Sequence, residues 1–232
     1  MSGKSGLATM DYSKEFGKWS MWYIPIFALV YIILNVFIRE SELNDMSFFA
    51  MALSANRVYM LVLGILAVYT FLEWSLSLGL TRKDFFRAMV SAGVIVTLLV
   101  TAATAAISFV FGLMPWFGTG IPEVSGGMET IVHVGGYMLS TLLYFLGGFL
   151  ISVGFYRGFV PGMGTVVLNI ILFMATDVMW SREGAAGIPA IDSLDLMSGM
   201  NMGAAAVMTL AVLAIVCAVL YYTIRDIPLK IK

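Results

Sequence analysis

Long apolar segments dominate this chain, and they constrain its fold more than any other feature. A transmembrane α-helix needs about 20 mostly apolar residues. Six segments meet that requirement: 22–38, part of 48–72, 89–113, 131–156, 158–180 and 202–224. None of them alternates apolar and polar residues over about 10 positions, as the strands of a membrane β-barrel do. The sequence therefore predicts an all-α polytopic membrane protein, with six transmembrane helices in a single transmembrane domain over residues 1–232.

The composition excludes several other classes of protein. Hydrophobic residues make up 60% of the chain and charged residues 12%, and the mean hydropathy is +0.95. A soluble domain needs more polar surface than this to cover its core. A net charge of −1 gives no basic field for nucleic acid. With one histidine, His133, and one cysteine, Cys217, we predict no catalytic residue and no cofactor or metal bound by this chain.

The distribution of basic residues predicts the orientation of the helices in the membrane. With six spans, both termini and two of the loops lie on the same side. Most of the 13 lysines and arginines lie on that side, whereas the other side is mainly acidic. Cytoplasmic loops of membrane proteins are enriched in Lys and Arg. We therefore expect a multi-pass protein of the plasma membrane whose N- and C-termini are both cytoplasmic.

Residues 9–20, which precede the first span, have an amphipathic pattern. At 100° per residue, Tyr12, Phe16 and Trp19 share one helical stripe, and charged residues lie opposite. The pattern predicts an amphipathic interfacial helix before span one. Two interpretations remain open: a juxtamembrane anchor, or a connector helix that transmits force from a cytoplasmic partner.

The cytoplasmic loop between spans two and three, residues 73–87, has recognisable local signals. Gly79 permits a turn, and Thr81 with Asp84 forms a capping box that begins the third helix. Residues 73–78 form a short amphipathic stretch that is suited to docking on a partner protein. Two outer loops, 114–130 and 181–201, could cap a pathway or serve as solvated connectors.

Small and charged residues within the spans give two further expectations. Gly154, Gly158 and Gly162 have Gly-x-x-x-G spacing, which points weakly to close helix packing. Asp177 is the one acid inside a span, and Arg57 lies at a similar outer depth, so we consider them a possible intramembrane pair. Asp177 could instead be a solvated interface residue or a proton-coupling site.

The layout and the loop together resemble the permease subunits of bacterial ATP-binding-cassette exporters of the type-2 (ABCG-like) family. The likeness lies in the amphipathic segment, the six spans, and a loop with Glu73 followed by Leu-Gly-Leu-Thr-Arg-Lys-Asp-Phe-Phe over 78–86. The resemblance implies that this loop is a coupling helix that docks on an ATPase. The coupling residues it implies are Glu73, Trp74, Leu76 and Leu78, flanked by Arg82, Lys83 and Arg87.

The resemblance also implies the partners and the mechanism. Such a permease works as a dimer, homo- or heteromeric, with separate ABC ATPase subunits that bind ATP and Mg²⁺. The chain would be a transporter subunit and not an enzyme, and the apolar spans favour an amphipathic peptide or another hydrophobic cargo. A self-sufficient secondary carrier or channel, and a non-transporting membrane scaffold or sensor, are the alternatives.

Overall fold

The structure, a computed structural model, describes residues 3–37, 48–114, 127–180 and 202–225. The described residues form α-helices and no strands. Each helix contains a segment long and apolar enough to cross a membrane, so the prediction of an all-α polytopic membrane protein is confirmed. The helices are α1 (Gly3–Phe37), α3 (Phe48–Ser77), α4 (Arg82–Gly112), α5 (Gly127–Arg157), α6 (Phe159–Trp180) and α7 (Met202–Arg225).

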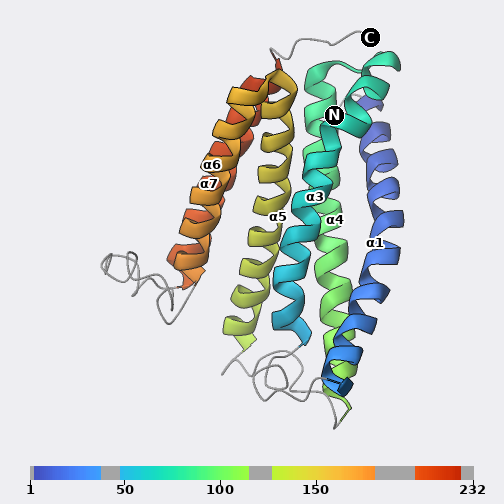
Figure 1. The fold of residues 1–232 in the computed structure, drawn as a ribbon, viewed down its shortest axis with the longest axis vertical. Coiled ribbons are helices and arrows are strands. Elements are labelled where there is room, and N and C mark those ends of the chain that lie inside the picture. Colours follow the sequence, from blue (N-terminus) through green and yellow to red (C-terminus); the bar gives the residue numbers. More distant parts are fainter. Residues whose placement is uncertain (1–2, 38–47, 115–126, 181–201, 226–232) are drawn as a thin grey trace.

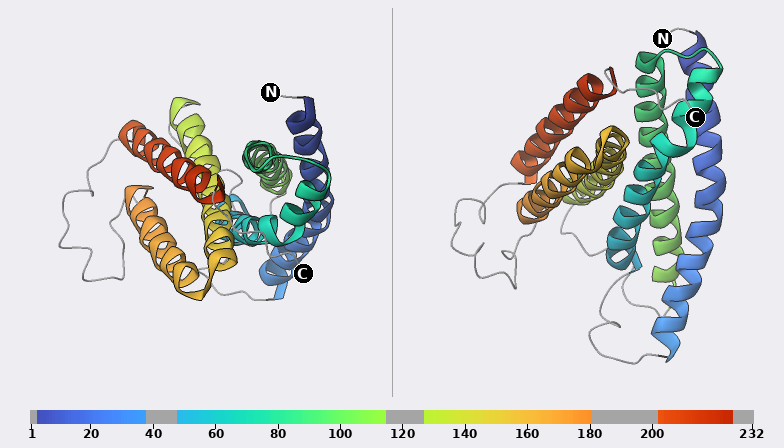
Figure 2. Two further views of the ribbon diagram at one scale, coloured as in Figure 1. Left: turned by 90° about the horizontal axis from the view of Figure 1, so that it is seen from above. Right: turned by 45° about the horizontal axis from the view of Figure 1, so that its top comes forward.

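The helices run alternately up and down, so that α1 begins and α7 ends at the same end of the bundle (Figure 1). Helix α5 packs against α3, α4, α6 and α7, and its span is the most buried of the six. Helices α1, α3 and α4 lie on one side of α5, and α6 and α7 lie on the other (Figure 2). Which end faces the cytoplasm stays a prediction.

Helix α1 differs from the expected arrangement in one respect. Residues 9–20 are helical, but they continue without a break into the first span, with Pro25 inside the helix. Their aromatic stripe faces protein: Tyr12 and Phe16 are fully buried, while Asp11, Lys14 and Lys18 are exposed. At 1.5 Å per residue the 35-residue helix is about 52 Å long, well beyond a hydrocarbon core of about 30 Å.

The segment 9–20 continues into the first span without a break because α3 and α5 offer it aromatic side chains to pack on. The Phe16 ring packs edge-to-face on Phe71 and on Phe145, with centroids 5.4 and 6.0 Å apart. Such aromatic pairs add to the free energy of simple apolar burial. The first part of α1 is therefore part of the core and not a separate helix in the headgroup plane.

Helices α3 and α5 cross in direct backbone contact at two glycines. A Cβ added to Gly148 would collide with the carbonyl oxygen of Leu61, and one added to Gly64 would collide with that of Phe145. Small residues allow such close approach between membrane helices, where dispersion contacts drive association. The Gly-x-x-x-G run is arranged differently, because a Cβ on Gly154 would meet the Thr165 side chain and one on Gly162 would meet the Phe155 ring, both across the α5–α6 turn.

The connection between α3 and α4 follows the local signals in the sequence. Gly79 adopts a positive φ of 76°, and the amides of Gly79 and Leu80 bond to the carbonyls of Leu76 and Ser75 at 3.0 and 3.1 Å. This is a Schellman ending of α3. The Thr81 hydroxyl then accepts a hydrogen bond from the Asp84 amide at 3.1 Å, so the predicted cap of α4 is confirmed.

The same connection is tighter than the predicted 73–87 loop. Residues 73–77 belong to α3 and residues 82–87 to α4, which leaves only residues 78–81 as the turn. We call residues 73–81, the last helical turn of α3 and this tight turn, the elbow. The end of the bundle that carries it is called the elbow end. Of the two predicted outer loops, 114–130 and 181–201, most lies outside the described residues, and 127–130 belong to α5.

Candidate functional site

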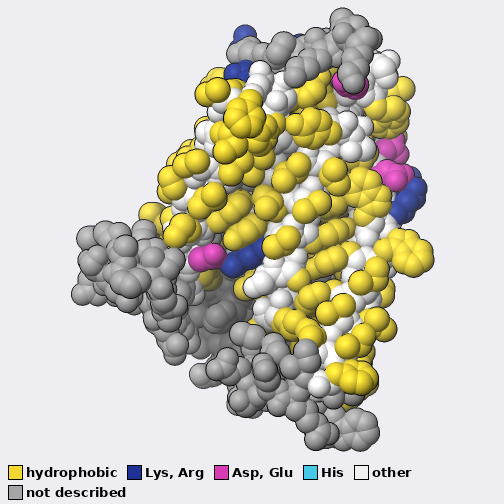
Figure 3. All heavy atoms as spheres, in the orientation of Figure 1, with side chains coloured by type: hydrophobic (Ala, Val, Ile, Leu, Met, Phe, Trp, Pro, Cys, Tyr) yellow, Lys and Arg dark blue, Asp and Glu magenta, His cyan; other side chains and the backbone are white. Residues whose placement is uncertain are grey.

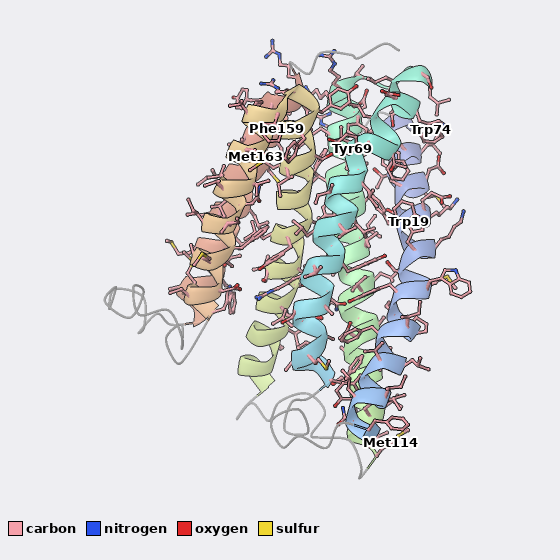
Figure 4. All side chains as sticks on the ribbon, in the orientation of Figure 1. Trp19, Tyr69, Trp74, Met114, Phe159 and Met163 are labelled. Carbon is pink, nitrogen blue, oxygen red and sulfur yellow. The ribbon has the colours of Figure 1, made fainter. Side chains whose placement is uncertain are left out.

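A groove of about 480 Å³ separates the first part of α1 from the last turns of α3. Figure 4 shows Trp19 of α1 and Trp74 of α3 on this side of the bundle. The groove has aromatic walls and a charged rim of two acids and two lysines on α1. Its lining consists of Asp11, Tyr12, Lys14, Glu15, Lys18, Trp19, Thr70, Phe71 and Trp74.

Tyr12 joins α1 to the elbow. Its hydroxyl is hydrogen-bonded to Ser75 Oγ, and Ser75 Oγ itself donates to the Phe71 carbonyl. Because the serine proton is used in that way, the tyrosine donates to the serine. The Tyr12 ring also contacts the rings of Phe71, Trp74 and Phe85, at centroid distances of 5.0, 6.5 and 6.1 Å. A displacement of the elbow would therefore be transmitted to α1.

The predicted coupling residues divide into exposed and packed side chains. Trp74 and Leu78 are 46% and 58% exposed, and Glu73 is exposed as well. Leu76 is half-buried and packs against the main core. The elbow therefore presents two large apolar side chains and one carboxylate at the surface, while Leu76 packs against the core and holds the elbow in place.

The flanking basic residues also divide into two groups. Lys83 and Arg87 are exposed. Arg82 turns toward α7, where its Nη1 donates to the Arg225 carbonyl at 2.8 Å, and Arg157 Nη2 donates to the Thr223 carbonyl at 2.8 Å. The last carbonyls of a helix lack partners within the helix, and cations at that end are stabilising. Arg82 and Arg157 thus cap α7.

Arg57 and Asp177 form an ion pair between α3 and α6. Arg57 Nη1 lies 2.8 Å from Asp177 Oδ1, and the guanidinium lies 5.5 Å from the centroid of the Tyr144 ring. Tyr144 stacks in turn on Phe173 at 3.9 Å. The pair is uneven, because the Arg57 side chain is 15% exposed and that of Asp177 is 46% exposed.

The pair neutralises the two candidate charges and links three helices. Asp177 is the only acidic residue within α6. A carboxylate that an arginine holds in an ion pair is a weaker candidate for proton coupling than an isolated one, because the arginine already occupies it. The geometry supports a structural role over the proton-coupling interpretation.

A buried amide at Asn56 was not predicted from the sequence. Its Oδ1 accepts from the Tyr23 hydroxyl at 2.9 Å, and its Nδ2 donates to Thr104 Oγ1 at 2.9 Å and to the Tyr137 hydroxyl. This network joins α1, α3, α4 and α5. The sequence signal that could have revealed this network is Asn56 itself, an amide inside an apolar helix. Such amides form hydrogen bonds between helices in membranes. Because an amide carries no charge, the ionisable residues of the spans gave no indication of it.

Other candidate chemistry is sparse. Within the described ranges, no three His, Cys, Asp or Glu side chains gather as metal ligands would. The His133 side chain lies outside what the structure describes. Comparison with known proteins identifies no relative: no protein-family model, curated protein or solved structure matches this chain. The site must therefore be judged on its geometry.

Proposed function

We propose that this chain is a membrane-spanning subunit of an ATP-driven exporter and that the elbow is its contact with a separate ATPase. One observation carries the proposal: Trp74 and Leu78 are exposed on a rigid, capped turn that Tyr12 bonds to α1. Burying an apolar side chain of this size contributes about 1.5–3 kcal/mol. Two of them on one rigid turn suit a docking contact with a partner protein.

The length of α1 supports a mechanical role for that contact. Because the helix is continuous from Gly3 to Phe37, a push on the elbow would act through Tyr12 on one rigid element that reaches the other end of the bundle. ATP-driven closure of the ATPase would in this way shift the bundle between inner and outer access.

The outward surface of the bundle supports a dimer. In Figure 3 hydrophobic side chains dominate the visible face. Asp177 is nevertheless about half exposed at the surface of α6. Ionisable groups in membrane spans usually face protein or a water-filled cavity. We infer that the surface near Asp177 faces a second permease subunit and the path between them, and that the cargo is amphipathic or hydrophobic.

The elbow residues provide the first test. We expect a tagged wild-type chain to copurify from native membranes with a P-loop ATPase, and we expect Trp74→Asp combined with Leu78→Asp to reduce that recovery at least tenfold. Loss of two apolar contacts of about 1.5 kcal/mol or more each would have this effect. Recovery is measured by quantitative mass spectrometry relative to the chain itself.

A matched control separates docking from general disturbance. Ser77 is exposed in the same helical turn, so Ser77→Asp adds one negative charge, as each of the two substitutions does, without removing an apolar contact. This variant should keep the ATPase. Equal ATPase recovery with the double variant, at wild-type membrane insertion, would refute the assignment of the elbow.

A further inference from the structure

The elbow end holds a second cavity, which lies between the start of α4 and the end of α7. Its volume is about 320 Å³, at the lower end of the range of about 300–1,000 Å³ that is typical of ligand pockets. Three basic side chains, Arg82, Lys83 and Arg225, line it over an apolar floor of Phe86, Tyr221 and Ile224.

The charges of this pocket are one-sided. Among the described residues no carboxylate lines it, whereas the groove between α1 and α3 has two acids and two lysines on its rim. Asp84, which follows Lys83 in the sequence, accepts a hydrogen bond from the Thr81 hydroxyl at 2.7 Å. Asp226, which follows Arg225, lies outside the described residues. Among the described residues, neither Lys83 nor Arg225 forms an ion pair. The pocket therefore has positive charge that suits an anion.

Arg82 is held in place for such an anion. Its Nη1 donates to the Arg225 carbonyl at 2.8 Å, which fixes the guanidinium. Its other N–H groups bond to no residue within the described ranges, so they can bind a ligand. Arginine presents a planar fork of donors that matches phosphate oxygens. The chemistry therefore favours a phosphate group.

The position of the pocket selects the molecule that carries the phosphate. Arg82 is the first residue of α4 and Arg225 the last of α7, so the basic residues mark the ends of two membrane-spanning helices, where lipid headgroups lie. The floor is apolar, with Phe86 and Tyr221 packed edge-to-face at 5.7 Å. Val219 and Tyr222 on the same turns of α7 are exposed, which offers apolar surface for an acyl chain.

We propose that this pocket binds the phosphate headgroup of an anionic phospholipid. Basic pockets between transmembrane helices recognise such headgroups. The proposal needs only the bilayer and the described residues, and it does not depend on the exporter assignment.

Titration of the purified full-length chain in detergent tests the proposal. Native mass spectrometry would measure binding of short-chain phosphatidylglycerol, with phosphatidylethanolamine as the headgroup of no net charge and glycerol phosphate as the free anion. We expect wild-type protein to prefer phosphatidylglycerol to both. Each basic residue near a membrane surface strengthens binding to anionic lipid roughly fivefold. Lys83→Gln combined with Arg225→Gln should therefore weaken it by roughly 25-fold, and Lys83→Gln alone by roughly fivefold.

Lys14→Gln combined with Lys18→Gln is the matched control, because it removes the same charge at the same end of the bundle but in the other groove. It should leave the lipid affinity unchanged.

Equal lipid binding by the two double variants, or no preference for phosphatidylglycerol over phosphatidylethanolamine, would overturn the proposal. Tighter binding of glycerol phosphate than of the lipid would assign the pocket to a free anion. If Lys83→Gln combined with Arg225→Gln lost a copurifying ATPase but kept its lipid affinity, the pocket would be assigned to a protein contact. Both results contradict a lipid site.

Discussion

Of the Gly→Ala substitutions in α5, Gly148→Ala should destabilise the protein most. The new Cβ would meet the Leu61 carbonyl oxygen and lie 3.0 Å from the Ile65 amide nitrogen. Overpacking usually costs about 1–3 kcal/mol when side chains can move. Here the obstacle is the backbone of α3 itself, so we expect a loss at or above about 3 kcal/mol and a lower melting temperature in detergent.

Gly135→Ala provides the comparison in the same helix. A Cβ at Gly135 meets nothing within 4 Å, so alanine should be neutral or stabilise by up to about 1 kcal/mol through its helix propensity. Gly64→Ala should resemble Gly148→Ala, because its Cβ would lie 2.8 Å from the Phe149 amide nitrogen as well as against the Phe145 carbonyl. Identical melting temperatures for Gly148→Ala and Gly135→Ala would show that α3 and α5 do not cross there.

Removing Asp177 should cost more stability than removing its partner. Asp177→Leu leaves the Arg57 guanidinium, with its side chain 15% exposed, without its counter-ion. Arginine cannot shed its charge by deprotonation. Arg57→Met leaves Asp177, whose side chain is 46% exposed and therefore far less buried than that of Arg57. Breaking a fully buried pair costs about 3–5 kcal/mol, and exposed pairs contribute about 0–1 kcal/mol. Because only the Arg57 side of this pair is mostly buried, we expect an intermediate loss of about 1–3 kcal/mol for Asp177→Leu and a smaller loss for Arg57→Met.

The double variant completes a thermodynamic cycle for this pair. Arg57→Met with Asp177→Leu leaves no uncompensated charge, and replacing both members of a buried pair by apolar residues is often neutral. We therefore expect it to be more stable than Asp177→Leu alone, as measured by thermal or chemical unfolding in detergent. Strict additivity of the two single losses would mean that the two charges do not interact.

Features set by neighbouring residues could be predicted from the sequence. The turn at Gly79 and the Thr81 cap depend on backbone groups within a few residues, so their patterns sufficed. The helices themselves followed from their apolar length. The pairing of Arg57 with Asp177 could be considered because helix rise and the positions of the span ends place both residues at a similar depth.

Features set by how the helices pack could not be predicted in the same way. Gly64 and Gly148 are far apart in sequence, and their contact depends on the order and rotation of α3 and α5. The turn of Arg82 toward Arg225 depends on α4 and α7 being neighbours. The continuity of α1 reflects packing of Tyr12 and Phe16 on protein, which an amphipathic stripe cannot distinguish from packing on a membrane surface.

The contact made by the elbow is the central claim, and site-specific photocrosslinking tests it most directly. A photoreactive phenylalanine analogue would replace Leu78 in the elbow, or Phe37 at the opposite end of the bundle, where the side chain is also exposed. After irradiation of native membranes, the probe at position 78 should form an adduct with a P-loop ATPase, and the probe at position 37 should not. An adduct with lipid alone at position 78, or labelling of that position by a membrane-impermeant reagent added outside the cell, would contradict the account.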